Sequence, residues 1–183
     1  MLRPWKRGDL GDLAEGLDDL KVSKWLALVP YPYSRAEARG WIRHCSTGAR
    51  KPATNRASHE FAIELKSSGR VIGGVSLDRV DRAQGTACGG IWVAAAHHGM
   101  GYGTEAYAER SRFAFEELGL RRIESGYFRG NEASARMHRR LGYRKEGVRT
   151  EGLLCRADGK CKDEVIVALL RSDWRRQTSR CRL

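Results

Sequence analysis

Proline and long apolar runs are scarce in this chain, and its cysteines form no recognisable pattern. Four of the 183 residues are proline, and no stretch of 18 or more apolar residues occurs, which excludes a membrane-spanning helix. The first residues, MLRPWKRGDL, are charged and lack the apolar run of a signal peptide. We therefore expect a soluble cytoplasmic protein with no membrane partner. The chain has five cysteines, Cys45, Cys88, Cys155, Cys161 and Cys181, and none of them form a Cys-x-x-Cys pair. They therefore suggest neither a disulfide framework nor a metal site.

Acidic residues are also in short supply, because 22 Asp and Glu against 34 Lys and Arg leave a formal net charge of +12. Nucleic acid, an anionic membrane surface, an acidic protein or a phosphorylated cofactor would each suit that charge. The length predicts a single domain, which we place at residues 1–174, followed by a frayed basic tail at residues 175–183. The sequence does not separate a monomer from a homodimer.

The spacing of apolar and turn residues predicts a mixed α and β domain. Helical spacing occurs within residues 10–28, and Ser34 with Glu37 forms a capping-box pattern that begins a second helix. Two more helices are predicted, over residues 102–118 and after Asn131. Strands are predicted at residues 61–65, 71–77, 90–94, 123–128, 146–154 and 164–170.

The segment HHGMGYGTEA places Gly99, Gly101 and Gly103 between a predicted strand and a predicted helix. Glycines let backbone amides approach a ligand, and unpaired N–H groups at a helix start form an anion site suited to a pyrophosphate. A tight strand-to-helix turn explains the same residues more simply. The loop lacks the Gly-Lys-Ser/Thr ending of a Walker A motif, and its hairpin-rich surroundings do not fit a dinucleotide-binding βαβ unit.

The loop His98-Gly-Met-Gly-Tyr-Gly103 resembles the pyrophosphate loop of the GNAT N-acetyltransferases. Further matches favour the RimJ/RimL branch, the N-terminal acetyltransferases of ribosomal proteins, and extend almost to Trp174: Pro32-Tyr33-Ser34, Gly90-Ile-Trp-Val93, Asn131-Glu-Ala-Ser134, Leu141-Gly-Tyr143 and Glu146-Gly147. The resemblance implies an α/β (α+β) domain of the GNAT fold. Such a domain has a central mixed, mostly antiparallel twisted sheet with a splayed strand pair, and helices on both faces.

By the same resemblance, acetyl-CoA would lie between the strands at residues 90–94 and 123–128. The backbone of Trp92 and Val93 would pair with the pantetheine arm and help polarise the thioester carbonyl. Asn131 would hydrogen-bond the pantetheine, with Ser134 beside it. The pyrophosphate would be cradled by His98, Gly99, Met100, Gly101, Tyr102, Gly103 and Thr104. No metal is implied.

Two positions depart from the family pattern. His98 stands where Arg or Gln is usual, so a permanent charge is replaced by one that titrates near neutral pH. Cys88 stands where many members carry a glutamate that is a candidate base. The remaining base candidates on neighbouring strands are Glu60, Glu124 and His59.

The departing thiolate needs a proton, and three residues are candidates to supply it. Ser134 is the acid proposed in the branch that this chain resembles. His138 occupies the position of a tyrosine acid in other GNAT members, although its arginine neighbours favour a solvated side chain. Tyr127 on the predicted strand is the third candidate.

The favoured function is direct transfer of an acetyl group from acetyl-CoA to the N-terminal α-amine of a protein or peptide, with a ribosomal protein as one possible acceptor. Without a strong base an α-amine is the easier acceptor, because roughly 15% of it is neutral at pH 7 against about 0.04% of a lysine. Two alternatives stay open. One is the same chemistry on a small-molecule amine, an antibiotic or a polyamine. The other is a non-catalytic basic module that binds the ribosome or nucleic acid, although no RNP, helix-turn-helix or zinc pattern supports nucleic acid.

Overall fold

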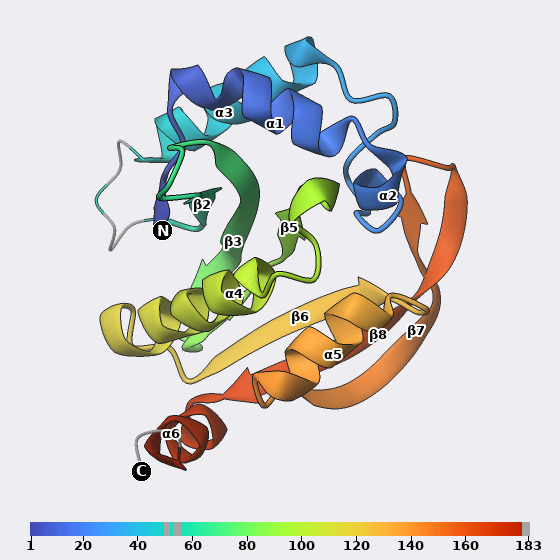
Figure 1. The fold of residues 1–183 in the computed structure, drawn as a ribbon. Helices are drawn as coiled ribbons and strands as arrows, with labels where there is room; N and C mark the ends of the chain where they lie inside the picture. Colours follow the sequence, from blue (N-terminus) through green and yellow to red (C-terminus); the bar gives the residue numbers. More distant parts are fainter. Residues whose placement is uncertain (50–51, 53–55, 181–183) are drawn as a thin grey trace.

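The computed structural model describes residues 1–49, 52 and 56–180. Strands and helices alternate along the chain in the order that Figure 1 shows. The strands are β1 (Leu2–Pro4), β2 (His59–Glu64), β3 (Val71–Asp81), β4 (Thr86–Cys88), β5 (Ile91–Val93), β6 (Arg122–Phe128), β7 (Arg144–Cys155) and β8 (Lys160–Leu170). The helices are α1 (Leu10–Leu17), α2 (Leu20–Ser23), α3 (Arg35–Ala49), α4 (Tyr102–Arg112), α5 (Glu132–Arg140) and α6 (Arg171–Arg180), with short turns at Arg7–Asp9, Ala95–His97 and Phe113–Glu117.

The eight strands form one sheet in the order β1-β2-β3-β4-β6-β8-β7, with β5 paired to β3 beside that path. Each pairing is antiparallel except that of β4 with β6, which is parallel. The expected mixed, mostly antiparallel sheet is therefore confirmed. Helices α1 and α3 lie over one end of it, and α4 and α5 lie beside β5 and β6 (Figure 1).

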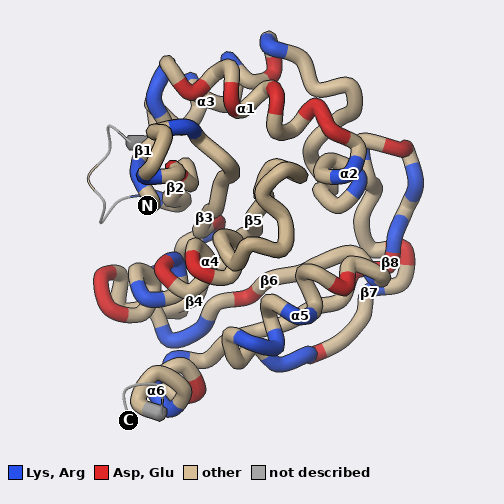
Figure 2. The backbone as a smooth tube through the Cα atoms, viewed as in Figure 1, with Lys and Arg blue, Asp and Glu red and all other residues tan. Residues whose placement is uncertain are grey.

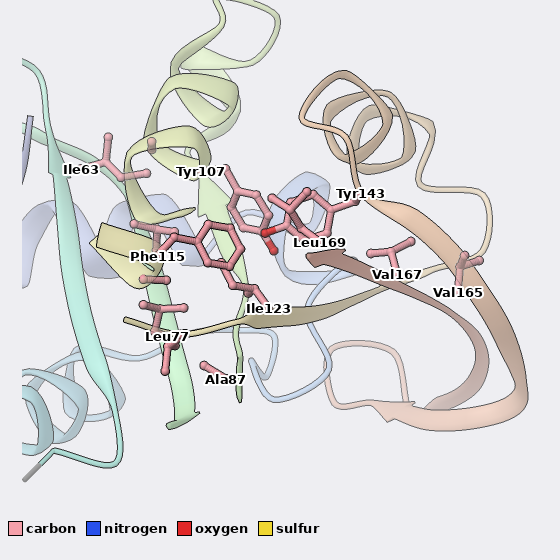
Figure 3. Packing of buried hydrophobic residues seen from close by; sticks show 14 of the residues in the cluster. Ile63, Leu77, Ala87, Tyr107, Phe115, Ile123, Tyr143, Val165, Val167 and Leu169 are labelled. Atoms are coloured by element: carbon pink, nitrogen blue, oxygen red, sulfur yellow. The ribbon is translucent and has the colours of Figure 1, made fainter. Parts of the chain in front are cut away.

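Two apolar cores hold the helices to the sheet. The larger one lies under α4 and includes Leu77, Phe115 and Ile123, none of which is exposed to solvent (Figure 3). The second joins α1 and α3 to the opposite face through Leu13 and Ile42. Burial of such side chains contributes about 1.5–3 kcal/mol each, so both faces of the sheet are anchored and helices on both faces are confirmed.

The sheet splits at Gly89. Strand β3 pairs with both β4 and β5. Its residue Asp78 pairs with Cys88 of β4, and its residue Val75 pairs with Ile91 of β5. Strand β4 continues the sheet to β6, whereas β5 pairs only with β3 among the described strands. A side chain at residue 89 would overlap the carbonyl oxygen of Ser76, so glycine permits this close approach. The split separates β5 from β6 and opens the sheet at this point.

The helix boundaries agree with the sequence where local capping decides them. The Ser34 hydroxyl accepts from the N–H of Glu37 at 3.2 Å, while Glu37 Oε2 accepts from the N–H of Ser34 at 2.9 Å. This is the predicted capping box. The side chain of Asn131 likewise accepts from the N–H of Ser134 at 3.1 Å and begins α5.

Residues 10–28 do not form one helix. Helix α1 ends at Leu17, and α2 begins after Asp19, whose carboxylate accepts from the N–H of Lys21 at 2.8 Å. The carboxylate of Asp18 accepts from the N–H of Tyr33 at 2.8 Å. Aspartate side chains that bond to nearby backbone compete with a continuous helix, which explains the break.

The C-terminal segment is more ordered than the sequence predicted. Residues 175–180 continue helix α6, so a frayed tail beginning at residue 175 is wrong, and residues 181–183 lie outside the described residues. The ring of Trp174 packs 5.4 Å from that of Phe115, and the side-chain amide of Gln177 donates to the carbonyl of Arg140 at 2.6 Å. These contacts with distant parts of the chain hold the helix in place. The short strand β4 was also missed, because its parallel partner β6 is distant in sequence.

Candidate active site

A cleft of about 760 Å³ opens where the sheet splits. Its walls come from β5, β6, the loop before α4, one side of α5, and the segment that follows α2. Trp92, Gly126 and Tyr127 line it from the strands, and Trp25 lines it from the segment after α2. The two strands that the sequence predicted to splay therefore border one cavity.

The glycine-rich loop occupies one end of this cleft. Gly99 and Gly101 adopt φ angles of +76° and +87°, a region that costs other residues about 1–2 kcal/mol. Gly101 immediately precedes α4, and no side chain caps the helix. The first N–H groups of α4 therefore keep their capacity for an anion. The geometry is compatible with the pyrophosphate site that the sequence predicted.

Not every predicted loop residue faces the cleft. His98, Gly99, Gly101, Gly103 and Thr104 line it. Met100 instead projects outward with 61% of its surface exposed. Tyr102 lies on a different groove, between α4 and α6, which Trp174 also lines.

The side chain of His98 is hydrogen-bonded within the protein and does not point outward toward a ligand. Its Nε2 lies 2.7 Å from the carbonyl oxygen of Val93. A carbonyl can only accept, so Nε2 carries the proton. The ring thereby ties the loop to the end of β5, a role the sequence did not suggest.

The free edge of β5 presents backbone groups to the cleft. Ser76 N–H donates to the Gly90 carbonyl at 3.0 Å, and Ala94 N–H donates to the Ile72 carbonyl at 2.8 Å. Because alternate residues of an antiparallel strand face the same partner, the N–H and C=O groups of Ile91 and Val93 face away from β3. The N–H of Val93 is thus available for the predicted pairing, although its carbonyl accepts from His98, whereas the backbone of Trp92 faces β3.

A buried polar network forms the floor of the cleft. His138 is only 3% exposed, so the expected solvated side chain is wrong. Its Nδ1 lies 2.8 Å from the carbonyl oxygen of Ser134 and must carry a proton, which leaves Nε2 as an acceptor. Nε2 lies 3.3 Å from the hydroxyl of Tyr107 and 3.2 Å from that of Ser125.

The environment keeps His138 neutral. Burial lowers its pKa to about 4, the hydrogen bond to Ser134 opposes this shift, and the charge of Arg110 adds to it. Arg110 is itself fully buried and lies 3.7 Å above the ring of Tyr107. A neutral imidazole with its lone pair on Nε2 accepts hydrogen bonds at that atom and does not donate a proton from it.

Two hydroxyl groups near His138 line the same cleft. The ring of Tyr127 stacks on His138 with centroids 5.3 Å apart, and burial raises the pKa of this tyrosine. The hydroxyl of Ser134 lies 3.3 Å from His138 Nδ1. Both side chains keep their protons at neutral pH and line the cleft, so either can donate a hydrogen bond to a ligand there.

The family model of the acetyltransferase (GNAT) domain matches residues 1–144 of this sequence. The chain belongs to the GNAT acetyltransferase family. It is therefore an acetyltransferase, and the GNAT fold uses acetyl-CoA as the acetyl donor.

Several named relatives of this GNAT protein are N-acetyltransferases. Over 116 residues, 63% of each chain, it is 36% identical to YjcK of Bacillus subtilis, a probable N-acetyltransferase. It is 26% identical to the uncharacterized N-acetyltransferase p20 of Bacillus licheniformis over 94% of this chain and 93% of that protein. Over 57% of this chain and 53% of the relative, it is 31% identical to the ribosomal protein uS5-alanine N-acetyltransferase of Escherichia coli.

Solved structures of the same fold superpose over most of this chain. RimJ of Mycobacterium smegmatis, in complex with CoA-disulfide, matches with a TM-score of 0.80 and 26% identity over 93% of this chain and 81% of that one. The spermidine N-acetyltransferase of Vibrio cholerae, in complex with CoA and spermine, matches with a TM-score of 0.79 and 21% identity over 95% and 96%. At that identity, the second likeness shows the fold alone.

The base candidates suggested by the sequence do not reach the cleft of this GNAT domain. Glu124 is exposed on β6 and pairs with Arg122 at 3.1 Å. Glu60 lies beside Asp78 and is absent from the cleft lining; burial raises its pKa, and Asp78 raises it further. His59 is buried against Phe61 and Phe113, where burial lowers its pKa to about 4.

Sequence reasoning missed several side chains that line the cleft, among them three polar ones on α4, β6 and β8. Tyr107 and Ser125 complete the network around His138, and Glu164 extends from β8. Tyr107 belongs to an apolar helix face and Ser125 to an alternating strand, so neither carried a local signal. The described residues include no group of three or more potential metal ligands and no helix long and apolar enough to span a membrane.

Proposed function

We propose that this GNAT protein transfers an acetyl group from acetyl-CoA to the N-terminal α-amine of a protein or peptide. The charge of the cleft carries this proposal. Lys21, Arg136 and Arg140 line it, and Glu164 is the one carboxylate among the described residues that do so. A cleft of this composition suits an acceptor with a single positive charge.

A polyamine fits the cleft less well. Spermidine carries several ammonium groups, each of which would lose hydration in the cleft, and Glu164 is the one carboxylate that the described residues place there to replace it. An α-amine also requires less help from a base, because its pKa near 7.8 leaves roughly 15% of it neutral at pH 7. Cys88, at the position where a glutamate base is common, lies 3.1 Å from Arg79 Nε and supplies no carboxylate.

The residues that would hold acetyl-CoA follow from the geometry of the cleft. The backbone groups of Ile91 and the N–H of Val93 would pair with the pantetheine arm, whereas the Val93 carbonyl already accepts from His98. The start of α4 would bind the pyrophosphate. The side-chain amide nitrogen of Asn131 is a further donor, since its oxygen is used to cap α5. Bound acetyl-CoA would supply a thioester carbonyl, which backbone N–H donors stabilise as negative charge develops on its oxygen.

Ser134 and Tyr127 are the proposed proton donors to the departing thiolate. Both line the cleft, and each is protonated at neutral pH. His138 instead positions its neighbours, because its Nδ1 proton is bonded to the Ser134 carbonyl and its Nε2 accepts. We expect Ser134→Ala and Tyr127→Phe to lower kcat by about 10²–10⁴-fold for whichever residue is the acid.

The proposal is tested by a free-thiol assay with acetyl-CoA and four acceptors. The first two are peptides with free N-termini that begin with alanine or serine, since alanine is named as the acceptor residue of the Escherichia coli relative. The third is the alanine peptide with a blocked N-terminus and one internal lysine, and the fourth is spermidine. We expect thiol release with the free N-termini, and mass spectrometry should place the acetyl group on the α-nitrogen.

Other acceptor patterns would contradict the proposal. Turnover confined to spermidine would assign the protein to small polycationic amines. Turnover of the blocked peptide at an equal rate would assign it to lysine side chains. If a ribosomal protein is the source of the acceptor, its purified N-terminal peptide should have the highest kcat/KM of the panel.

A further inference from the structure

Strand β6 presents two chemically different faces to the cleft. Ser125 and Tyr127 contact His138, so these side chains point toward α5. Because side chains alternate along a strand, Gly126 and Phe128 face the opposite side. Helix α5 and the loop that precedes α4 lie on the side that would bind the cofactor. The Gly126 side is therefore the one left for the acceptor.

The acceptor side is enclosed by the segment after α2 and the hairpin of β7 and β8. The Arg156 N–H donates to the carbonyl of Ala27 at 3.1 Å, and Lys162 Nζ donates to that of Lys24 at 2.9 Å. Trp25 and Leu26, which lie between these two attachments, line the cleft. The wall is therefore apolar and fixed to the sheet.

Glu164 is the carboxylate on this side. It faces Phe128 across the β6 and β8 pairing, and its side chain turns back over Gly126. The fit is close enough that a Cβ atom at residue 126 would overlap Glu164 Oε1. The absence of a side chain at Gly126 thus makes room for the carboxylate at the cleft surface.

Glu164 has unused hydrogen-bonding capacity. Glu164 is 8% exposed. Among the described residues its ion-pair partner is Arg149, whose Nη2 lies 3.0 Å from Oε2. The Arg149 side chain is 61% exposed and holds the carboxylate from outside the cleft. An ionised carboxylate has about four acceptor sites. The oxygen over Gly126 is therefore free to accept from a ligand.

We infer that Glu164 binds the ammonium group of the acceptor and takes its first proton, a role that rests on the proposed amine acetylation. The ammonium loses one proton to the carboxylate and becomes a neutral amine. Its lone pair forms the N–C bond to the acetyl carbon as the C–S bond breaks. The departing sulphur takes a proton from the hydroxyl of Ser134 or Tyr127, the second nitrogen proton restores that hydroxyl as the amide forms, and Glu164 releases the first proton to water.

The first experiment compares the wild type with Glu164→Gln, which preserves the shape of the side chain and removes its charge. Calorimetry on the CoA complex measures binding of the alanine peptide and of its des-amino analogue, which lacks the ammonium group. A hydrogen bond between charged groups contributes enough that we expect the wild type to prefer the free amine by about 10- to 100-fold. The variant should lose this preference and keep the wild-type affinity for CoA.

A matched control is Glu117→Gln, which removes one carboxylate in the segment Phe113–Glu117 that follows α4, where Glu117 pairs with Arg112 at 3.0 Å. This change should leave the kcat/KM of the peptide unaltered. It therefore separates the loss of Glu164 from a general change in net charge.

Gly126→Ala provides an independent test, because it displaces the Glu164 carboxylate without removing it. Gly126 has no positive φ angle, so alanine is compatible with the strand. We expect the same loss of preference for the amine. The double variant Gly126→Ala/Glu164→Gln should be no more impaired than Glu164→Gln alone, because both changes act on one interaction.

The outcomes separate this inference from the proposed function. If the wild type acetylates the peptide and Glu164→Gln is equally active, Glu164 has no such role although the function stands. If spermidine is the acceptor instead, the proposed function fails, and the same variants measured on spermidine decide the role of Glu164. If Glu164→Gln loses CoA affinity and retains the preference for the amine, the carboxylate supports the cofactor side and the inference is wrong.

Discussion

The glycine at the start of α4 allows a direct test of where the pyrophosphate binds. Gly101 has φ +87°, and a Cβ atom built there meets no other atom within 4 Å. We propose to compare Gly101→Glu with Gly101→Gln. Both carry the same backbone strain and similar volume, so their difference isolates one negative charge at the helix N-terminus.

The magnitude follows from Coulomb's law. Two phosphate charges about 6 Å from the new carboxylate would cost about 1.4 kcal/mol together in bulk water, and more where the site excludes water. Because 1.4 kcal/mol corresponds to a tenfold change in affinity, the Glu variant should bind CoA at least about tenfold more weakly than the Gln variant.

Calorimetric titration with CoA measures this difference at low and high salt. The difference should shrink as salt increases, since ions screen exposed charges. Circular dichroism on both variants checks that the fold is retained. Equal affinity of the Glu and Gln variants for CoA would show that the pyrophosphate does not bind at the start of α4.

Three further changes have predictable effects. The pKa of His138 is about 4 in the folded protein and 6.5 for the free side chain. Folding therefore favours the neutral form. Its contribution to the free energy of unfolding is complete above pH 6.5 and is lost as the pH falls toward 4. At pH 4.5 the free energy of unfolding is lower by about 2.5 kcal/mol for this reason. Urea unfolding at pH 7.5 and 4.5 should show a smaller decrease in that free energy for His138→Gln than for the wild type. His98→Ala removes the 2.7 Å hydrogen bond to Val93 and should weaken CoA binding about fivefold in calorimetry, whereas unchanged affinity would exclude an anchoring role. Ser34→Ala breaks the capping box of α3 and should lower the free energy of unfolding by about 1 kcal/mol, measured in urea, with kcat unaltered.

The positive charge of the molecule is unevenly distributed. Lys and Arg residues lie along α5, β7 and α6, whereas the charged residues of α1 are Asp and Glu (Figure 2). Arg136 and Arg140 of α5 line the cleft, so part of the +12 charge is placed where a phosphorylated ligand would bind.

Features that depend only on neighbouring residues could be predicted from the sequence. The capping box at Ser34 and the cap at Asn131 each join atoms three residues apart. The glycines of the loop before α4 are needed for local backbone angles. Such interactions are set by residue type and spacing, so a single segment contains all the information required.

The tertiary structure alone decided which side chains meet in the cleft. His138 and Tyr107 are 31 residues apart, and their contact makes the histidine buried and neutral. Glu164 reaches the cleft because Gly126, on a strand that is distant in sequence, has no side chain. The burial and protonation state of these side chains depend on the pairing of β6 with β8 and on the packing of α5 against β6. The environment of each group therefore exists only after the strands have assembled.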